Sequence, residues 1–432
     1  MIAVFRPLKD RAVLTVWLGL NASTIGEDLF RVAVVWLAVE AAGNLAGLIT
    51  AAQYGVMLVV GLFGSVVLDA WRADRAMFWA KAWSALFAIL PVIGFYLYGV
   101  SITLLILSSV GVAAMRMVFS PALQEATPTL VRDRTSMLAV NSLFDVSWRL
   151  ARLIGPIAAA FLNLFLPVIH FLTATALGFL ASAGTVAATH QRLIDPDAKP
   201  RSFRSGWRGV VDTLTAAARL MLGERLTGAL LLTNAMVNGP WTVALSLAIA
   251  VMISEYDPTF LGFSGLAAYA LVMGAFGVGD VVANLVVGSV RFRRPLSTMF
   301  LGYFAMGGGF TLLALTVWVL PPAWLLPSMM LAAALAGWGG PFYFVPMITR
   351  MQMVFHGSDI ARVFRFRLAV MAASMLVWSA AATPLLNWLG SAGTELLCGL
   401  LIVAIGAVGY AICRRIEDRD PQATVSPAHP QK

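Results

Sequence analysis

Apolar and basic residues alternate along this chain in a pattern that restricts its fold more than any other feature. Twelve apolar segments follow one another, each long enough for a bilayer-crossing helix, which needs about 20 residues. In lipid, backbone polar groups must be hydrogen-bonded within the element, and these segments are too long and too apolar for barrel strands. The sequence therefore predicts an all-α integral membrane protein with twelve transmembrane helices.

Lys and Arg fall in every second gap between these segments. Neither residue occurs in the gaps at 40–44, 98–101, 165–167, 254–259, 320–323 and 389–394. The other gaps contain the basic residues Arg72, Arg75, Lys81, Arg132, Arg134, Arg192 through Arg208, Arg291, Arg293, Arg294 and Arg350 through Arg367. Because cytoplasmic loops retain positive charge, we expect this side and both termini to face the cytoplasm.

The composition agrees with a membrane location. Hydrophobic residues make up 60% of the chain and charged residues 12%, which is too apolar for a soluble core. The formal net charge of +9 would suit nucleic acid in a soluble protein, but here the basic residues lie along one membrane face. The spacing of Cys398 and Cys413 fits neither a metal site nor an easy disulfide. We expect contact with membrane lipids, no nucleic acid, no metal and no cofactor.

The chain divides into four predicted parts. Residues 1–189 form a six-helix bundle, and 190–225 form a cytoplasmic linker that carries an amphipathic helix around Trp207. Residues 226–415 form a second six-helix bundle, and the proline-containing tail 416–432 is expected to be disordered.

The two predicted bundles also repeat one another. The polar turn at 69–75 corresponds to 291–295, and the segment 121–134 corresponds to 346–362 with a similar offset. Transporters with repeated halves bind substrate near the bilayer midplane and expose it alternately to each side. The sequence therefore favours transport of a small molecule, and we expect the chain to act as a monomer.

Three charged residues lie deep in the first predicted helix. Glu27 and Arg31 are four residues apart and Asp28 and Arg31 three apart, so the arginine can pair with either acid and leave the other nearly free. A buried spare carboxylate binds protons more readily, as a proton-coupled carrier requires. Glu27 and Asp28 are therefore proton-coupling candidates, and Arg31 is a cavity candidate. The alternative is a neutralised cluster that holds helices together.

Further charges lie in the fourth and fifth predicted helices. Asp145, Arg149 and Arg152 form a polar stripe on the fifth, and Arg116 lies midway along the fourth. These four residues are substrate-cavity candidates, because the arginines could meet the acids of the first helix or an anionic part of a substrate. The alternative is a set of interhelical salt bridges.

Asp280 is the third proton-coupling candidate and is expected to be the only acid deep in the carboxy-terminal half. It follows Gly274, Gly277 and Gly279 on a helix whose small residues permit close packing. The alternative is a packing site with a neutralised acid.

Three sequence segments resemble motifs of the major facilitator superfamily. They are 61–69, 120–131 and 150–156. Within this superfamily, the chain resembles the branch of prokaryotic exporters that includes the enterobactin exporter and macrolide-efflux-like carriers. It implies two pseudo-symmetric six-helix bundles and a cytoplasmic gate. The gate residues would be Asp69, Arg72, Arg75, Arg362 and Arg365.

The chain departs from the family patterns in two motifs. Ser65 and Ala70 differ from the residues usual in the gate motif, and Ala159 and Ala160 occupy positions where antiporters often have glycine.

The preferred function is a proton-coupled exporter of a small amphipathic or anionic molecule, such as a siderophore or drug, in the bacterial cytoplasmic membrane. The alternatives are an importer or lipid flippase of the same fold and a transport-inactive scaffold. An enzyme is not expected, because the four histidines are scattered and no nucleotide-binding loop is present.

Overall fold

The computed structural model describes residues 7–68, 72–131, 134–193, 207–289, 294–355 and 358–419. Across these ranges it is almost entirely helical and contains no strand. The chain divides into two compact units, Met1–Val210 and Val211–Lys432, referred to as unit 1 and unit 2. The predicted boundaries of the linker and of the two bundles stay predictions.

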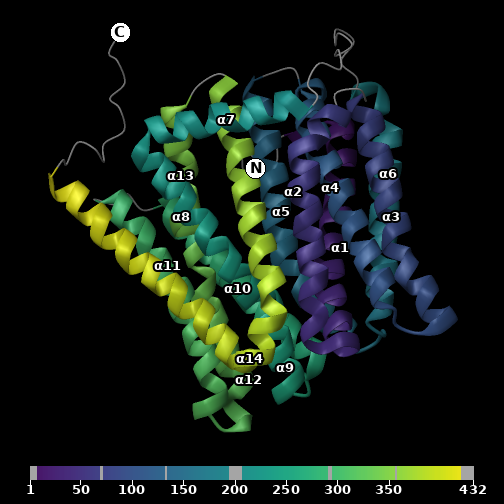
Figure 1. Ribbon diagram of the computed structural model, residues 1–432. Helices are drawn as coiled ribbons and strands as arrows, with labels where there is room; N and C mark the ends of the chain where they lie inside the picture. Colours follow the sequence, from purple (N-terminus) through teal and green to yellow (C-terminus); the bar gives the residue numbers. More distant parts are fainter. Residues whose placement is uncertain are drawn as a thin grey trace. The chain divides into compact units, whose positions relative to one another are not determined.

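Unit 1 contains six membrane-length helices (Figure 1). They are α1 (Arg11–Ala42), α2 (Gly47–Leu68), α3 (Ala73–Tyr98), α4 (Ile102–Leu130), α5 (Arg134–Leu162) and α6 (Ile169–Thr189). Short 3-10 turns, η2 (Gly43–Ala46) and η3 (His190–Arg192), lie after α1 and α6. The next helix, α7 (Trp207–Gly223), occupies the place where the amphipathic linker helix is predicted.

Local side chains and glycines set the ends of these helices. Asp10 caps α1 by accepting a hydrogen bond from the backbone N–H of Ala12 at 2.8 Å, which satisfies a donor left free in the first turn. Gly43 and Gly99 end α1 and α3 with φ of 52° and 85°. Glycine adopts this left-handed backbone without a steric cost, so the chain can turn sharply here.

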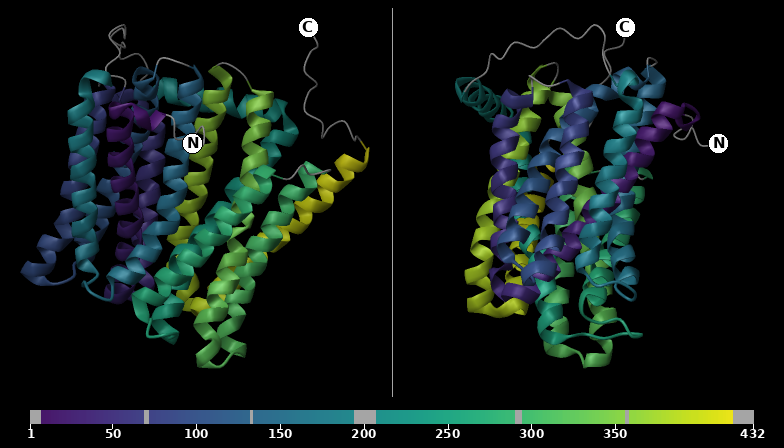
Figure 2. Two further views of the ribbon diagram at one scale, coloured as in Figure 1. Left: turned by 180° about the vertical axis from the view of Figure 1, so that it is seen from behind. Right: turned by 90° about the vertical axis from the view of Figure 1, so that its right-hand side faces the viewer.

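The helices of unit 1 run side by side in both views (Figure 2). α1 packs against α5 and α6, and α3 packs against α4 and α6. Small residues allow these approaches: an ideal Cβ on Gly178 of α6 would lie 2.6 Å from the carbonyl oxygen of Ala22 on α1. The core between these helices is apolar, with Val13, Met77 and Phe119 nearly inaccessible to solvent.

Unit 2 contains the remaining crossings. Its elements after α7 are α8 (Arg225–Thr242), the π-helix η4 (Val243–Ala248), α9 (Ile249–Tyr256), α10 (Gly265–Ser289), α11 (Pro295–Val319), α12 (Pro322–Gly337), α13 (Gly339–Val354) and α14 (Ser358–Arg419). The first three form one continuous helix, and α12 and α13 form another that is interrupted at Trp338. α14 contains two crossings that meet at Gly390, whose φ is 72°.

The described residues contain twelve helical segments of membrane length, as the sequence predicts. Among the described residues, nine stretches meet the length and hydropathy requirements for a membrane span. Two of them, 11–61 and 366–419, each hold two consecutive helices, and α5 adds the shorter apolar segment Leu150–Leu162. α14 continues to Arg419, so the helix extends past residue 416, where the tail is predicted to begin.

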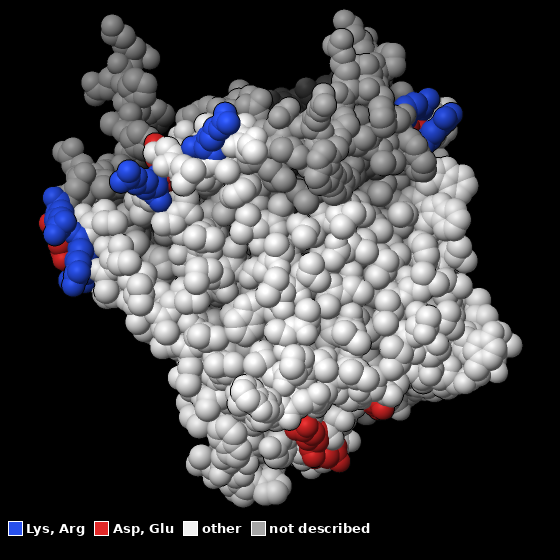
Figure 3. Space-filling model, viewed as in Figure 1, with Lys and Arg blue, Asp and Glu red and all other residues white. Residues whose placement is uncertain are grey.

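Charged groups are distributed as a membrane protein requires. Figure 3 shows few Lys, Arg, Asp and Glu side chains among large areas of uncharged surface. Uncharged surface of this extent suits contact with acyl chains, where a charge is costly. The chain is a multi-pass membrane protein.

Candidate functional site

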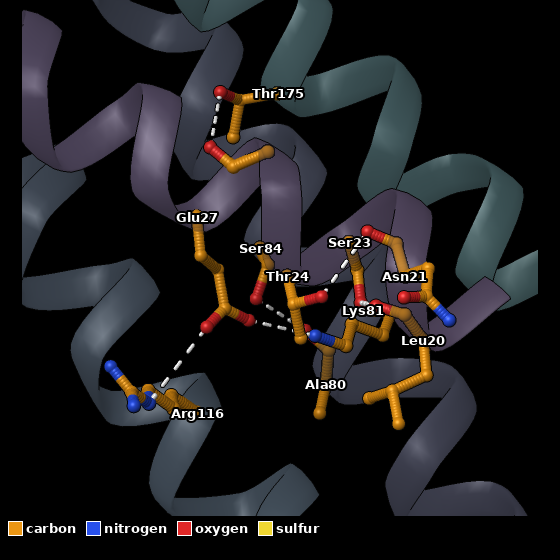
Figure 4. A network of polar contacts seen from close by, with 11 residues as sticks. Leu20, Asn21, Ser23, Thr24, Glu27, Ala80, Lys81, Ser84, Arg116 and Thr175 are labelled. Carbon is orange, nitrogen blue, oxygen red and sulfur yellow. Dashed lines mark hydrogen bonds and ion pairs between the residues drawn. The ribbon is translucent and has the colours of Figure 1, made fainter. Parts of the chain in front are cut away.

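Glu27 of α1 lies between two cations from different helices. Its Oε1 accepts a hydrogen bond from Nζ of Lys81 on α3 at 2.9 Å. Its Oε2 lies 3.8 Å from Nε of Arg116 on α4 (Figure 4). We call these three residues the charge network. It joins α1, α3 and α4 inside unit 1, so the structure brings together two predicted site residues, Glu27 and Arg116.

Lys81 is buried inside α3, and its assignment to a basic gap between helices is wrong. Its side chain is 2% exposed, and Nζ lies 4.1 Å from the ring centre of Phe119 and 5.0 Å from that of Phe179. Aromatic ring faces attract a cation. Glu27 is nevertheless the acid that neutralises Lys81 among the described residues. α3 begins at Ala73, so Lys81 lies about two turns inside the helix. Its position in the helix could have indicated burial, but the alternation of basic gaps favoured a loop.

Arg116 is the exposed member of the network. It lies near the middle of α4, its side chain is 51% exposed, and its guanidinium lies 5.3 Å from the ring centre of Trp148 on α5. A charge facing acyl chains at this depth would cost about 2.5 to 3.5 kcal/mol or more. The exposed part of Arg116 must therefore face water or a polar ligand.

Asp28 is paired as well, so the prediction of a spare carboxylate in the first helix is wrong. Nη2 of Arg31 forms an ion pair with Oδ1 of Asp28 at 2.5 Å. Glu27 forms its own ion pair with Lys81. The sequence analysis left one acid of the first helix without a partner because it placed Lys81 in a loop outside the membrane. Gly155 of α5 packs directly on Asp28, since an ideal Cβ there would lie 2.4 Å from the Cβ of Asp28.

The polar stripe of α5 is described only in part. The side chains of Asp145 and Arg149 lie outside the described residues, and Arg152 is exposed. On the same helix, Ser147 accepts a hydrogen bond from the indole N–H of Trp17 at 2.8 Å. A role of the stripe in binding stays a prediction.

Asp280 lies at the closest helix packing of unit 2. The Nδ2 of Asn284 donates to Oδ2 of Asp280 at 3.4 Å, and an ideal Cβ on Gly340 would lie 3.3 Å from Oδ1. Gly279 and Gly337 let α10 approach α12 and α13 here, with little room for any side chain. This environment agrees with the packing alternative, and Asp280 stays a candidate for coupling.

A second acid of this half, Glu395 on α14, is fully buried, with 0% exposure. The sequence placed Glu395 at a helix end. Arg367 is a second residue that was counted with the basic gaps but is buried, with 6% exposure. Its guanidinium lies 4.7 Å from the ring centre of Phe344, and its Nη2 lies 3.5 Å from Oδ1 of Asn234. Both residues were missed because each lies within a few turns of a predicted loop.

Most residues of the predicted cytoplasmic gate lie outside the part of the chain that the structure describes. Asp69 lies outside the described residues, as do the side chains of Arg362 and Arg365. Arg72 forms two hydrogen bonds with Asp74, both at 3.1 Å, and Arg75 is exposed at the start of α3. The gate stays a prediction.

Comparison with known proteins identifies the fold. No family model and no curated protein matches the sequence. Solved transporter structures do resemble it. A POT family transporter in complex with 5-aminolevulinic acid has a TM-score of 0.72 and 12% identity, with 94% of this chain and 96% of the other covered. A bacterial homologue of the iron transporter ferroportin, in an inward-facing state, has a TM-score of 0.68 and 13% identity over 93% and 99%.

A third structure is described as that of proton dependent oligopeptide transporters, with a TM-score of 0.65 and 14% identity over 95% and 100%. At these identities the likeness concerns the fold alone, an all-α fold of the major facilitator type. This is the fold that the sequence resemblance implies, and the exporter branch stays a prediction.

Proposed function

We propose that this chain is a proton-coupled secondary transporter of a small molecule with an anionic group. The proposal depends on one observation above all: Arg116 is a half-exposed cation in the middle of a transmembrane helix, and its contact with Glu27 is long at 3.8 Å. A guanidinium can bind a carboxylate or phosphate through two parallel hydrogen bonds. Transporter structures of the same fold support this function, and one was solved with 5-aminolevulinic acid.

Glu27 can couple proton binding to substrate binding. As a carboxylate it attracts Arg116 and competes with a substrate anion for the guanidinium. Once protonated it no longer competes, so the anion binds Arg116 more tightly. By linkage, the bound anion must favour protonation of Glu27 to the same extent.

Mutual enhancement favours transport of the proton and the anion in the same direction. This is the importer alternative and not the export predicted from the sequence resemblance. Ala159 and Ala160, where antiporters of the superfamily often have glycine, agree with it. Export of a siderophore- or drug-like molecule stays a prediction. Measuring the direction of substrate transport relative to the proton gradient decides it.

We place the protein in the bacterial cytoplasmic membrane with both termini in the cytoplasm. Support comes from the gaps between helices, which carry Lys and Arg on one side only. The proposal includes a role without enzymatic chemistry, in keeping with the transporters of similar fold. That the chain acts as a monomer stays a prediction.

The substrate and the coupling can be tested together. A panel of small carboxylates and phosphates, including 5-aminolevulinic acid, is first screened for thermal stabilisation of the purified protein. The compound that stabilises most is then used in proteoliposomes with an imposed pH gradient. We expect accumulation on the alkaline side. The variant Glu27→Gln with Lys81→Met, which neutralises the pair without leaving a buried charge, should lose accumulation and retain substrate exchange.

Glu40→Gln is the matched control, because Glu40 is an exposed acid at the carboxy-terminal end of the same helix. It should accumulate substrate like the unchanged protein. Undiminished accumulation by the Glu27 and Lys81 double variant would refute coupling through Glu27. Accumulation of substrate against the direction of proton flow would support proton-coupled export instead.

A further inference from the structure

Glu395 is a buried carboxyl group that the charge network does not use. It lies in the first turns of the second crossing of α14 and is 0% exposed. Neither of its carboxyl oxygens has a hydrogen-bond partner among the described residues. A lone ionised carboxylate is very costly to bury, so this environment accommodates the neutral, protonated group.

The helices around Glu395 offer no positive charge. α14 packs against α8, η4, α9 and α11. The outer half of α11, from Phe310 to Val319, contains no titratable side chain, and η4 contains none. α8 has only Arg225, at its opposite end. Nearby titratable groups are Cys398 on α14 and, on α9, Glu255 and Tyr256. Among the described residues, a charged Glu395 would therefore have no counter-ion.

A polar route leads from the surface towards Glu395. Glu255 is exposed, and its Oε2 accepts a hydrogen bond from the hydroxyl of Ser391, which is 2% exposed. Ser391 and Glu395 are four residues apart on one helix, so their side chains lie on the same face, one turn from each other. Glu255 and Ser391 both belong to gaps without Lys or Arg, on the side predicted to face away from the cytoplasm.

We propose that Glu395 is a proton-binding site of unit 2, loaded from the non-cytoplasmic side through Glu255 and Ser391. The Glu255 carboxylate takes a proton from water, the Ser391 hydroxyl accepts it and releases its own proton, and the Glu395 carboxylate binds that proton. The inference rests on the proposed proton coupling for its physiological meaning and adds a second site to it. The charge network in unit 1 is a separate site.

Infrared spectroscopy of the reconstituted full chain tests the inference without a substrate. The carbonyl stretch of a protonated carboxyl group is distinct from the bands of a carboxylate. At neutral pH we expect a protonated-carboxyl band that is absent from Glu395→Gln and retained, at a shifted frequency, in Glu395→Asp. An identical band in the unchanged protein and in Glu395→Gln would overturn the inference. If Glu395→Gln does not fold, the frequency shift in Glu395→Asp decides.

The route is tested by transfer into heavy water, which shifts the band as the proton exchanges for deuterium. Glu255→Gln and Ser391→Ala should each slow this exchange about tenfold or more, as the loss of a positioned proton-transfer group does. Glu224→Gln is the matched control, because Glu224 is an exposed acid at the opposite end of the same continuous helix. Unchanged exchange in both route variants would refute loading through Glu255 and Ser391.

The result can be separated from the proposed function. A protonated Glu395 in a protein that accumulates nothing under a pH gradient would refute coupled transport and leave the proton site. Coupled transport by a protein without a Glu395 band would refute the proton site and leave the proposed function.

Discussion

At the scale of single residues, the stability of unit 1 depends on how Glu27 and Lys81 neutralise one another. Both are nearly inaccessible, but their surroundings differ. Glu27 has a second cation within reach in Arg116, at 3.8 Å. Among the described residues, Lys81 has besides Glu27 only the rings of Phe119 and Phe179. Removing Glu27 therefore leaves the worse-compensated charge.

We predict that Glu27→Gln destabilises the protein by about 3–5 kcal/mol, as expected when one partner of a buried pair is lost. Lys81→Met should cost less, because Arg116 can still compensate Glu27. The double variant should cost less than the sum of the two. Thermal unfolding in detergent measures all three. Additive losses, or a larger loss for Lys81→Met, would contradict this account of the pair.

The sequence predicted part of this network, and the rest depended on helix positions. Glu27 and Arg116 lie in the middle of long apolar segments, so their depth could be inferred from spacing. Lys81 lies only about two turns inside α3, where an uncertainty of a few residues in the helix start moves it between loop and core. Its pairing with Glu27, 54 residues earlier, depends on packing that no local pattern encodes.

At the scale of elements, glycines determine how closely the helices of unit 2 approach. An ideal Cβ on Gly279 of α10 would lie 1.9 Å from the backbone oxygen of Ala334 on α12. Backbone atoms cannot move aside as a flexible side chain can. The small residues around Asp280 were predicted to permit close packing, and this distance supports that interpretation.

We predict that Gly279→Ala forces α10 and α12 apart and destabilises the protein by about 1–3 kcal/mol, the usual cost of overpacking. Gly308→Ala on α11 is the matched control, because no atom of another helix lies within 4 Å of its ideal Cβ. It should unfold at the same temperature as the unchanged protein. Equal unfolding temperatures for both variants would show that the helices do not pack this tightly.

Helix lengths were predictable because lipid imposes them, but the interruptions within helices were not. Gly390 connects the two crossings of α14 in a gap that the sequence showed clearly. The break at Trp338 between α12 and α13 lies inside a continuous apolar run, where hydropathy carries no signal. Next to it, Gly337 lies close to the backbone of Phe276 and Asp280.

At the scale of the whole molecule, the account requires water at a charged site inside the membrane. The two native cysteines, Cys398 and Cys413, are buried, which makes a cysteine-accessibility experiment practical in a background with serine at both positions. Arg116, Lys81 and Trp83 then provide three distinct environments. They are a half-exposed charge, a buried charge and a 45% exposed apolar residue of α3.

The most direct test is to label Arg116→Cys, Lys81→Cys and Trp83→Cys separately in proteoliposomes with a charged, water-soluble thiol reagent. We predict that the thiol introduced by Arg116→Cys reacts readily, while the other two, in the core and facing lipid, do not. A thiol at the Arg116 position that reacts only with a lipid-soluble reagent, or with none, would contradict the hydrated charge site on which the proposed transport depends.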